Sequence, residues 1–483
     1  MRILFVSSEV VPFSKTGGLA DVAGALPAAL KKRGNEVTII TPRYRTVDPA
    51  RFGLRRRRGR LGIQVRGKTI QGGLLEGETP DGVDVIFVDQ AGYFDRDGLY
   101  GDGNKDYADN DERFTFFCRA ALECCRLAGL TPDVIHCNDW QTGPIPALLQ
   151  FEYRDRPELN SCGSVMTIHN LGYQGLFPPE SMMSLGLGWQ LFTPSNLEFF
   201  GKVSFLKAGL VFADKLTTVS RRYAKEIRTQ AMGFGLQGLL NERAQDLRGI
   251  MNGVDYRLWD PQHDRLISAN YSFDNLAGKV ACKADLQQAT GLPVDPDLPI
   301  FGCISRLTSQ KGLDLFIDAA DELLTLPCQW VFLGSGDPQI EAALEDLAGR
   351  YPEKLAERTT MDEELAHRIQ AGADMLMMPS LYEPCGLNQL YALRYGTIPI
   401  VRAVGGLDDT IDDVAEGEGN GFKFSGTKPA DLVMTVRRAL EYFGDRVKWR
   451  RLQEYTMSQD FSWDLPARQY ETVYRQAAEL RTD

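Results

Sequence analysis

Six polar residues whose types could carry out chemistry follow predicted strands of this sequence. They are three fixed cations, two carboxylates and one imidazole: Lys15, Arg306, Lys311, Asp139, Glu383 and His169. In open α/β sheets, ligands bind beyond the carboxyl ends of the strands, so these side chains are expected to share a site. Three cations match a diphosphate, because its departure from a sugar develops negative charge. The carboxylates could accept hydrogen bonds from sugar hydroxyls and stabilise an oxocarbenium-like centre. A neutral His169 could donate a hydrogen bond to a sugar hydroxyl.

Each of these residues also has a purely structural interpretation. A single Lys or Arg in a loop is more often solvated than functional. Asp139, just before Trp140, could cap the next helix, and His169 could be a satisfied histidine at a strand end. Glu383, before Pro384, could be an ordinary turn residue. The common position of all six, at the same end of predicted strands, favours a function.

A short glycine pattern occurs twice, once in each half of the chain. Gly17-Gly18-Leu19-Ala20-Asp21 returns as Gly405-Gly406-Leu407-Asp408-Asp409, and each copy follows a strand-like run and opens a helix-like one. Adjacent glycines at such a turn let the backbone approach a ligand and present free N–H groups at a helix N-terminus. With cations in both halves, the two turns predict two α/β domains that share one anionic ligand.

Short apolar runs alternate with helical patterns in both halves, which predicts parallel sheets covered on both faces. In the first half the predicted strands are Ile3–Ser7, Val37–Thr41, Val83–Val88, Val134–Cys137, Val165–Ile168 and Leu216–Val219. In the second half they are Ile300–Ser305, Trp330–Leu333, Met375–Met378 and Ile398–Val401, with helical runs such as Gly312–Leu324 and Leu387–Arg394.

The chain is too long for one hydrophobic core, since it has 483 residues. We predict a first α/β domain over residues 1–249 and a second over 250–458, because Gly253 and Asp255 offer a turn between two alternating blocks. The last stretch, residues 459–483, contains a predicted amphipathic terminal helix that could pack across either domain.

Composition restricts the partners of the protein. Hydrophobic residues make up 43% and charged residues 25% of the chain, as in a soluble globular protein. The net charge of −11 argues against nucleic acid, which requires a basic field. Arg55 to Arg58, with Arg60, form one basic run that is read as a solvated loop or strand edge, with contact to an anion or polymer as the alternative.

The sequence predicts a cytoplasmic protein. Its nine cysteines are scattered without zinc spacing and are expected to be reduced thiols. The apolar start, Arg2-Ile3-Leu4-Phe5-Val6, is shorter than a signal-peptide core, and no apolar run approaches the roughly 20 residues that span a bilayer.

Metal and nicotinamide sites are not predicted. Three acidic pairs resemble those that hold a cation against a nucleotide-sugar diphosphate, but they lie in loops where such pairs are common: Asp95 with Asp97, Asp109 with Asp111, and Asp295 with Asp297. No GxGxxG pattern follows the first predicted strand, and Gly334-Ser335-Gly336 is only a fragment of one.

The segment Lys15-Thr16-Gly17-Gly18-Leu19-Ala20-Asp21-Val22 resembles the N-terminal signature of bacterial glycogen synthases and plant starch synthases. The resemblance runs nearly end to end through further ordered motifs. They are Tyr107, Asp109-Asn110, Arg113-Phe114, Asn138-Asp139-Trp140-Gln141, Thr167-Ile168-His169-Asn170, Ser204-Phe205-Leu206-Lys207, Val219-Ser220, Asn252-Gly253-Val254-Asp255, Ser305-Arg306-Leu307, Gln310-Lys311-Gly312, Glu383-Pro384-Cys385-Gly386-Leu387 and Asp460-Phe461-Ser462-Trp463.

This resemblance implies a GT-B fold, in which two Rossmann-like doubly wound domains face a deep cleft. It also implies that the terminal helix within residues 459–483 crosses back to the first domain. It implies a retaining hexosyltransferase that moves glucose from ADP-glucose to the non-reducing end of an α-1,4-glucan in glycogen biosynthesis, with no metal and no cofactor. The resemblance does not predict an oligomeric state.

The resemblance also assigns roles by position. Lys15, Gly18, Arg306 and Lys311 would hold the diphosphate, and Glu383 would bind the donor glucose. Asp139 and His169 would line the acceptor side, and Cys385, Gly386 and Leu387 would present backbone N–H groups to the donor. The catalytic set is therefore Asp139, His169, Arg306, Lys311 and Glu383, and the others bind the donor.

Three positions depart from common patterns. Met361 stands where the family usually has Tyr, which weakens adenine stacking, and Leu381 stands where Arg is usual. Wider relatives carry a second Glu where this chain has Tyr391, so ribose recognition is expected to differ from theirs.

Other functions stay open at this point. A catalytically dead glucan-binding or regulatory protein would be expected to lack Lys15, Arg306, Lys311 or Glu383, and all four are present. A nucleotide-sugar epimerase of similar fold would release products without dependence on an acceptor. A phosphorylase would need a pyridoxal lysine in the second domain, for which no matching sequence is seen.

Overall fold

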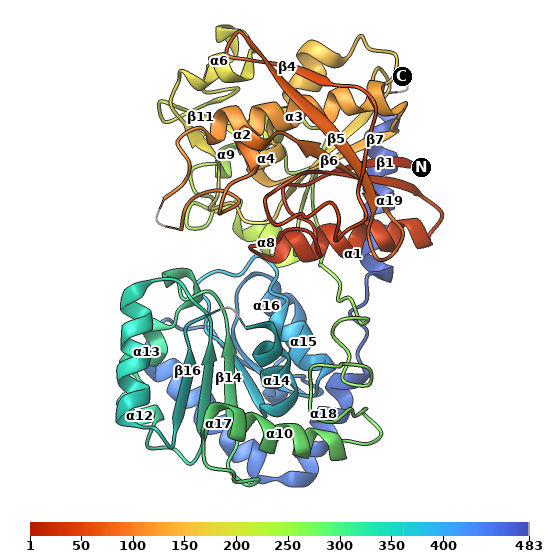
Figure 1. The fold of residues 1–483 in the computed structure, drawn as a ribbon. Coiled ribbons are helices and arrows are strands. Elements are labelled where there is room, and N and C mark those ends of the chain that lie inside the picture. The colour runs from red at the N-terminus through yellow and green to blue at the C-terminus, as the bar shows by residue number, and fades with distance from the viewer. Residues whose placement is uncertain (104, 361, 482–483) are drawn as a thin grey trace. The chain divides into compact units, whose positions relative to one another are not determined.

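The chain divides into two compact units in its structure, a computed structural model that describes residues 1–103, 105–360 and 362–481. Unit 1 comprises Met1–Gly253 together with the segment that begins at Trp463, and unit 2 comprises Val254–Ser462. Each unit is built around a sheet with helices on its faces (Figure 1).

The sheet of unit 1 has a parallel centre. Its strands lie in the order β13-β12-β8-β7-β1-β2-β6, and each neighbouring pair is parallel. Their bounds are β1 Arg2–Val6, β2 Glu36–Pro42, β6 Asp84–Asp89, β7 Val134–Asn138, β8 Gly163–Ile168, β12 Lys215–Thr218 and β13 Leu247–Gly249. All six strands predicted for this half are present, with bounds that differ by one or two residues.

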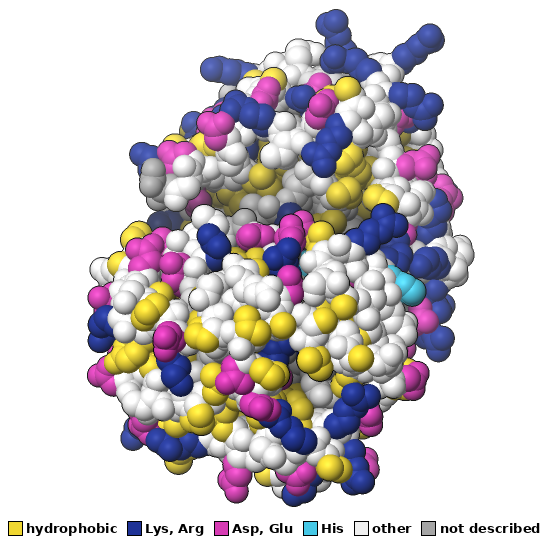
Figure 2. Space-filling model, turned by 60° about the horizontal axis from the view of Figure 1, so that its bottom comes forward, with side chains coloured by type: hydrophobic (Ala, Val, Ile, Leu, Met, Phe, Trp, Pro, Cys, Tyr) yellow, Lys and Arg dark blue, Asp and Glu magenta, His cyan; other side chains and the backbone are white. Residues whose placement is uncertain are grey.

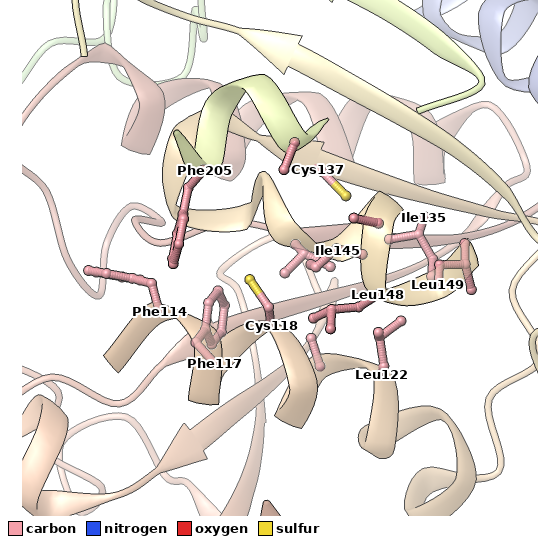
Figure 3. Packing of buried hydrophobic residues seen from close by; sticks show 14 of the residues in the cluster. Phe114, Phe117, Cys118, Leu122, Ile135, Cys137, Ile145, Leu148, Leu149 and Phe205 are labelled. Carbon is pink, nitrogen blue, oxygen red and sulfur yellow. The ribbon is translucent and has the colours of Figure 1, made fainter. Parts of the chain in front are cut away.

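Alternation along β1 shows how the sheet separates two layers of core. Ile3 and Phe5 are buried in one hydrophobic cluster with residues of α1 and α19, whereas Leu4 and Val6 are buried in a second cluster with residues of α3 and α5. Figure 3 shows part of the second cluster, where Phe117 and Leu122 of α3 approach Ile145 and Leu148 of α5. A strand that is apolar on both faces is typical of a doubly covered parallel sheet.

The helices of unit 1 follow or cover these strands. They are α1 Gly18–Lys32, α2 Ala91–Phe94, α3 Asn110–Ala128, α4 Asp139–Thr142, α5 Pro144–Leu148, α6 Ser181–Leu185, α7 Phe205–Phe212, α8 Arg221–Glu226, α9 Gln237–Glu242 and α19 Asp464–Glu479. A separate small antiparallel sheet has the order β10-β11-β9, with bounds Glu198–Phe199, Lys202–Ser204 and Leu176–Phe177.

One edge of the large sheet differs from the prediction of a purely parallel sheet. Beyond β6, strand β5 (Lys68–Glu78) runs antiparallel, and β3 (Arg55–Arg56) and β4 (Leu61–Val65) pair with it in antiparallel fashion. The basic run therefore includes edge strand β3, which fits its reading as a strand edge, since charged residues discourage pairing with other chains. Charge in β3 and glycine in β5 interrupt the strand pattern, whereas Leu61, Ile63 and Val65 of β4 do alternate with Gly62 and Gln64, a signal that the prediction did not use.

Unit 2 contains a six-stranded sheet of order β16-β15-β14-β17-β18-β19, in which every neighbouring pair is parallel. The strands are β14 Ile300–Ile304, β15 Gln329–Leu333, β16 Leu355–Arg358, β17 Met375–Met378, β18 Ile398–Arg402 and β19 Phe422–Phe424. The four predicted strands are confirmed, and the two outermost, β16 and β19, were missed because they are short.

The helices of unit 2 are α10 Ala277–Thr290, α11 Asp314–Asp318, α12 Ala320–Leu323, α13 Pro338–Arg350, α14 Glu363–Gly372, α15 Asn388–Arg394, α16 Gly405–Thr410, α17 Pro429–Gly444 and α18 Arg446–Ser458. The helical run predicted over Gly312–Leu324 is two short helices, because Ala319 leaves helical geometry between them.

Helix α19 follows unit 2 in the chain but belongs to unit 1. Its residues Tyr470, Val473, Tyr474 and Ala477 are buried in the same cluster as Ile3 and Phe5. The packing is close, since a Cβ added at Gly163 of β8 would lie 2.5 Å from the carbonyl oxygen of Ala477.

The face of the molecule in Figure 2 carries charges of both signs, interspersed with small groups of hydrophobic side chains. Within the described ranges, no helix combines the length and apolar character needed to cross a membrane.

Candidate functional site

In unit 2, Lys311 and Glu383 come together as a mostly buried ion pair. Lys311 Nζ lies 2.6 Å from Glu383 Oε2, and the Ser380 hydroxyl donates to the same oxygen at 3.0 Å. Lys311 follows β14 and Glu383 follows β17, which are neighbouring strands, so the pair lies at the carboxyl edge of the sheet as the sequence predicts.

Backbone contacts fix the two loops against each other. The N–H of Leu381 donates to the carbonyl of Gln310 at 2.8 Å, and the Gln310 side chain donates to the carbonyl of Tyr382 at 3.2 Å. Gly312 has a φ of 66°, and a Cβ there would lie 2.2 Å from the carbonyl oxygen of Pro379. Only glycine permits this approach, which explains why a glycine ends the Gln310-Lys311-Gly312 motif.

The second glycine pair packs directly against the loop of Glu383. Helix α16 begins at Gly405, the N–H of Gly406 donates to the carbonyl of Glu383 at 3.0 Å, and a Cβ on Gly406 would lie 2.0 Å from the carbonyl oxygen of Cys385. The close approach that the sequence predicts at this pair is therefore an approach of backbone to backbone. It places the start of α16 against the backbone of Glu383 and Cys385.

The segment between Glu383 and α15 exposes backbone donors. Gly386 has a φ of 70°, and the Gln389 side chain donates to the carbonyls of Cys385 and Gly386 at 3.0 Å each. The N–H groups of Gly386 and Leu387 donate to no acceptor in the described part of the chain. They are available to an anion or a sugar oxygen.

Arg306 lies in the loop that follows β14, with its side chain exposed. The loop is held close to the end of β15, because the N–H of Ser305 donates to the carbonyl of Leu333 at 3.0 Å. A Cβ on Gly334 would lie 1.7 Å from the carbonyl oxygen of Ser305, so the Gly334-Ser335-Gly336 fragment serves this packing. Arg306 and Lys311 thus lie on one loop of unit 2.

In unit 1, Lys15 and Gly18 lie at the start of α1. Lys15 Nζ is 2.7 Å from Asp21 Oδ1, and its side chain is 49% exposed. The first glycine pair is not a tight turn after β1 as predicted, because residues 7–17 intervene as a longer loop before α1 starts at Gly18. A Cβ on Gly17 would meet no atom within 4 Å, so the first glycine of this copy borders open space.

Glu9 holds the Lys15 loop in place, and sequence reasoning missed it. Its buried carboxylate accepts hydrogen bonds from the Thr16 N–H at 2.5 Å, the Thr16 hydroxyl at 2.6 Å, the Gly17 N–H at 3.2 Å and the Tyr100 hydroxyl at 2.6 Å. A carboxylate in a buried strand-end position is the signal that could have identified it, since buried acids are usually paired.

Asp139 and His169 are in direct contact. Asp139 is the first residue of α4, and its Oδ1 accepts the N–H of His169 at 2.7 Å. The N-cap position belongs to Asn138, so the interpretation of Asp139 as a helix cap is wrong. Asp139 has a φ of 55°, a left-handed conformation that is uncommon for a residue other than glycine and clusters at functional sites.

Burial shifts the protonation of both groups. Desolvation raises the pKa of Asp139 to about 7, against the hydrogen bonds from the N–H groups of His169 and Asn170. Burial lowers the pKa of His169 to about 3, so its imidazole is neutral at pH 7. Perturbed groups of this kind concentrate at functional sites.

The hydrogen bonds around His169 determine which of its ring nitrogens carries the proton. Asn138 donates from Nδ2 to the carbonyl of Val6 at 3.0 Å, which orients its Oδ1 toward His169 Nε2 at 2.9 Å. Nε2 must therefore carry the proton and donate to Asn138. The Nδ1 of His169 makes no hydrogen bond to a described residue and is an acceptor. In this tautomer the Nδ1 of His169 can accept a hydrogen bond from a sugar hydroxyl, whereas the sequence-based expectation is that the ring donates one.

The three acidic pairs considered for a metal are largely occupied by arginine. Arg45 Nε lies 2.7 Å from Asp95 Oδ1 and a second nitrogen contacts Asp97, while Arg96 holds Asp109 at 2.6 Å. Among residues 1–103, 105–360 and 362–481, no group of three potential ligands is placed to hold a metal ion.

Tyr391 has a packing role in this structure. Its ring stacks on Trp259 with centroids 4.1 Å apart, and His367 stacks on the opposite face of Trp259 at 3.9 Å. Leu381, beside the Glu383 loop, contributes its backbone, because Arg402 donates to its carbonyl at 2.8 Å. Met361 lies outside the described residues.

Comparison with known proteins matches both units. Residues 2–242 match the starch synthase catalytic domain, and residues 287–453 match the glycosyl transferases group 1 domain. The chain is 50% identical over 480 residues to a glycogen synthase of Anaeromyxobacter dehalogenans (strain 2CP-C), covering 99% of this chain and 100% of that protein. It is 49% identical over 485 residues to a glycogen synthase of Koribacter versatilis (strain Ellin345), covering 100% and 99%.

Solved structures of similar proteins support the same assignment. The catalytic domain of starch synthase IV from Arabidopsis thaliana, bound to ADP and acarbose, superposes with a TM-score of 0.93 at 34% identity and covers 99% of each chain. A sucrose-phosphate synthase from Thermosynechococcus elongatus shares the fold, with a TM-score of 0.61 at 20% identity over 98% of each chain. The protein is a glycosyltransferase of GT-B architecture, and the chain belongs to the family of bacterial glycogen synthases and plant starch synthases.

Proposed function

We propose that this enzyme elongates glycogen by transferring glucose from ADP-glucose, with retention of configuration, to the non-reducing end of an α-1,4-glucan. The observation that carries the proposal is the ion pair of Lys311 with Glu383, whose loop also presents the unpaired N–H groups of Gly386 and Leu387 and accepts the N–H of Gly406 at the start of α16. It combines a cation, backbone donors and a carboxylate within one edge of unit 2.

The chemistry assigns each group a task. Lys311 and Arg306, with Lys15 and the N–H of Gly18 from unit 1, neutralise the charge that develops on the departing ADP. The backbone N–H groups of Cys385, Gly386 and Leu387 bind the donor, and Glu383 accepts hydrogen bonds from hydroxyls of the donor glucose. Because Glu383 is already paired with Lys311, we give it a binding and electrostatic role.

Unit 1 binds the acceptor in this proposal. Asp139 and the Nδ1 of His169 accept hydrogen bonds from acceptor hydroxyls, which suits a neutral imidazole and a carboxyl of raised pKa. All nine cysteines are free and buried, which supports a cytoplasmic protein. The fixed cations make a metal or cofactor unnecessary for the transfer.

The test is incorporation of labelled glucose into glycogen from ADP-glucose and from UDP-glucose, each with and without chelator. We expect incorporation from ADP-glucose that the chelator leaves unchanged. Release of a free sugar or a changed nucleotide sugar without acceptor dependence would favour an epimerase, and binding of glycogen without transfer would favour a regulatory protein.

Glu383→Gln tests the role of the central pair. The substitution keeps the volume and removes the charge, so turnover is expected to fall by about 100-fold or more while affinity for ADP changes by less than about threefold. Turnover is measured at saturating substrates and ADP affinity by calorimetry, with Glu353→Gln at an exposed position as the matched control. Equal losses of turnover and ADP affinity would contradict the role given to Glu383.

A further inference from the structure

Arg113, in the first turn of α3, belongs to a sequence motif to which the proposed function gives no task. Its side chain is fully buried, at 0% exposed. Within the described ranges it forms no ion pair, and its hydrogen bonds go to neutral acceptors. Burying a charge without an opposite charge costs stability, so the presence of Arg113 needs another explanation.

The hydrogen bonds of Arg113 tie down the loop between α2 and α3. Nε donates to the carbonyl of Tyr93 at 2.7 Å, Nη1 donates to Asn110 Oδ1 at 2.6 Å, and Nη2 donates to the carbonyl of Leu99 at 3.0 Å. The acceptors lie before, after and within the loop, so one planar guanidinium fixes its two ends and a point between them. The single nitrogen of a lysine could not span these three acceptors.

The loop carries Tyr100 to the end of the first strand of unit 1. Asn110, which accepts from Arg113, also donates from Nδ2 to the carbonyl of Tyr100 at 2.9 Å. The Tyr100 hydroxyl donates to Glu9 Oε1 at 2.6 Å. The position of this hydroxyl therefore depends on the loop that Arg113 holds.

Glu9 passes this constraint to the loop of Lys15. Its carboxylate accepts the N–H groups of Thr16 and Gly17, the two residues that follow Lys15. Gly17 borders open space, so these hydrogen bonds, and not close packing around the glycine, hold the backbone there. A chain of hydrogen bonds thus runs from Arg113 to the residues beside Lys15.

A second contact leads from the same motif to the turn of Asp139. The ring of Phe114, next to Arg113, meets the ring of Trp140 edge to face, with centroids 4.9 Å apart. Trp140 directly follows Asp139, and helices α3 and α4 are in contact within unit 1 (Figure 1). The start of α3 therefore supports both Lys15 and Asp139, which come from different strand ends.

We propose that Arg113 is a positioning residue for glucosyl transfer, and this rests on the proposed function, which assigns Lys15 to the diphosphate. Arg113 is buried and touches neither substrate, so it acts through Tyr100 and Glu9. A loop that is fixed before the donor binds loses little freedom on binding, and its cation needs no reorganisation during the transfer. The stability lost by burying the guanidinium is the cost of fixing this loop in advance.

Arg113→Lys keeps the charge and removes the fork of donors. We expect amide hydrogen exchange at Thr16 and Gly17 to become about tenfold faster, because their loop opens more often. Arg119→Lys is the matched control, since Arg119 is a second buried arginine of α3 but pairs with Glu152. It should lower the midpoint of unfolding as well and leave exchange at Thr16 and Gly17 unchanged.

A kinetic cycle with Lys15→Ala separates positioning from a merely structural role. In the wild-type background, Arg113→Lys should lower kcat/KM for ADP-glucose by at least about tenfold. In the Lys15→Ala background the same substitution should lower kcat/KM by less than about twofold, because the cation that Arg113 positions is gone. The midpoint of unfolding should fall equally in both backgrounds.

Unchanged exchange at Thr16 and Gly17, or equal losses of kcat/KM in the two backgrounds, would overturn the proposal. If Arg113→Lys does not fold, Asn110→Asp repeats both measurements with the same expected directions, because it keeps an acceptor for Arg113 and removes the donor to the loop. A Lys15→Ala variant as active as the wild type would contradict the proposed function, whereas amide exchange still tests this inference because it needs no catalysis.

Discussion

Individual side chains of the site show a conflict between stability and function. Asp139 adopts a left-handed backbone conformation and buries a carboxyl group to which, among the described residues, the N–H groups of His169 and Asn170 donate. Its ordinary pKa is 3.8, and burial raises it to about 7. Between these pH values the folded chain binds a proton that the unfolded chain has lost, so this group's contribution to stability falls as the pH rises.

Asp139→Asn should therefore stabilise the protein at pH 8, where the wild-type carboxylate is charged in both states. We expect the free energy of unfolding to rise by about 1–3 kcal/mol, an amount that allows for relaxation around the charge. The gain should vanish below about pH 4, while glucan elongation falls at every pH. Urea titrations at the two pH values measure the gain, and a variant no more stable at pH 8 would show that burial does not dominate this group.

At the scale of elements, the predictable parts of the site are those that local pattern determines. The strands of both sheet centres, and the motifs at their carboxyl ends, follow from apolar runs such as Met375–Met378 and the polar residues after them. The edge strands could not be predicted in this way, because β3 is charged and β19 has only three residues.

Contacts between elements could not be predicted from the sequence. The hydrogen bonds of Glu9 to Thr16, Gly17 and Tyr100 join residues that no local pattern relates. The proton position on His169 depends on Asn138, which is held in turn by Val6 of another strand. The contact of Gly406 with Cys385 likewise depends on the arrangement of α16 and the loop that follows β17.

Gly406→Ala tests that last contact. An added Cβ would lie 2.0 Å from the carbonyl oxygen and 2.4 Å from the Cα of Cys385, so the loop of Glu383 must move. Since misplacement of about 1 Å can cost a hundredfold in rate, we expect kcat/KM to fall by roughly that factor.

Gly349→Ala in α13 is the matched control for this substitution, because its Cβ would meet nothing within 4 Å. It should leave kcat/KM unchanged. Steady-state kinetics with ADP-glucose and glycogen decide the comparison, and a fully active Gly406→Ala would show that the close approach is unnecessary.

At the scale of the whole molecule, α19 completes unit 1 after unit 2 has intervened in the chain. Its Tyr474 hydroxyl lies 2.8 Å from His136 Nδ1 within the core, and His136 Nε2 lies 2.6 Å from the Thr167 hydroxyl. Burial lowers the pKa of His136 to about 3 from its ordinary 6.5, so its contribution to stability is present above pH 6.5 and is lost as the pH falls toward 3.

Tyr474→Ala should release α19 from unit 1. Truncating a fully buried aromatic residue costs about 3–5 kcal/mol, and His136 also loses a partner. We expect trypsin to cut at Arg468 and Arg475 far faster than in the wild type at pH 7.5.

Tyr455→Ala on α18 removes an exposed tyrosine and should leave the cleavage rate unchanged. Cleavage followed by mass spectrometry distinguishes the two variants. Equal protection of both would mean that α19 is held by other contacts, such as that of Glu471 with Arg33.

The late position of α19 has a consequence for biosynthesis. As the chain leaves the ribosome, residues 1–253 emerge first, yet Ile3 and Phe5 lack the partners that Tyr470 and Val473 provide. Unit 2 is contiguous and can fold while the preceding segment still waits for its last helix. The nascent first unit is thus the segment most in need of chaperone protection during translation.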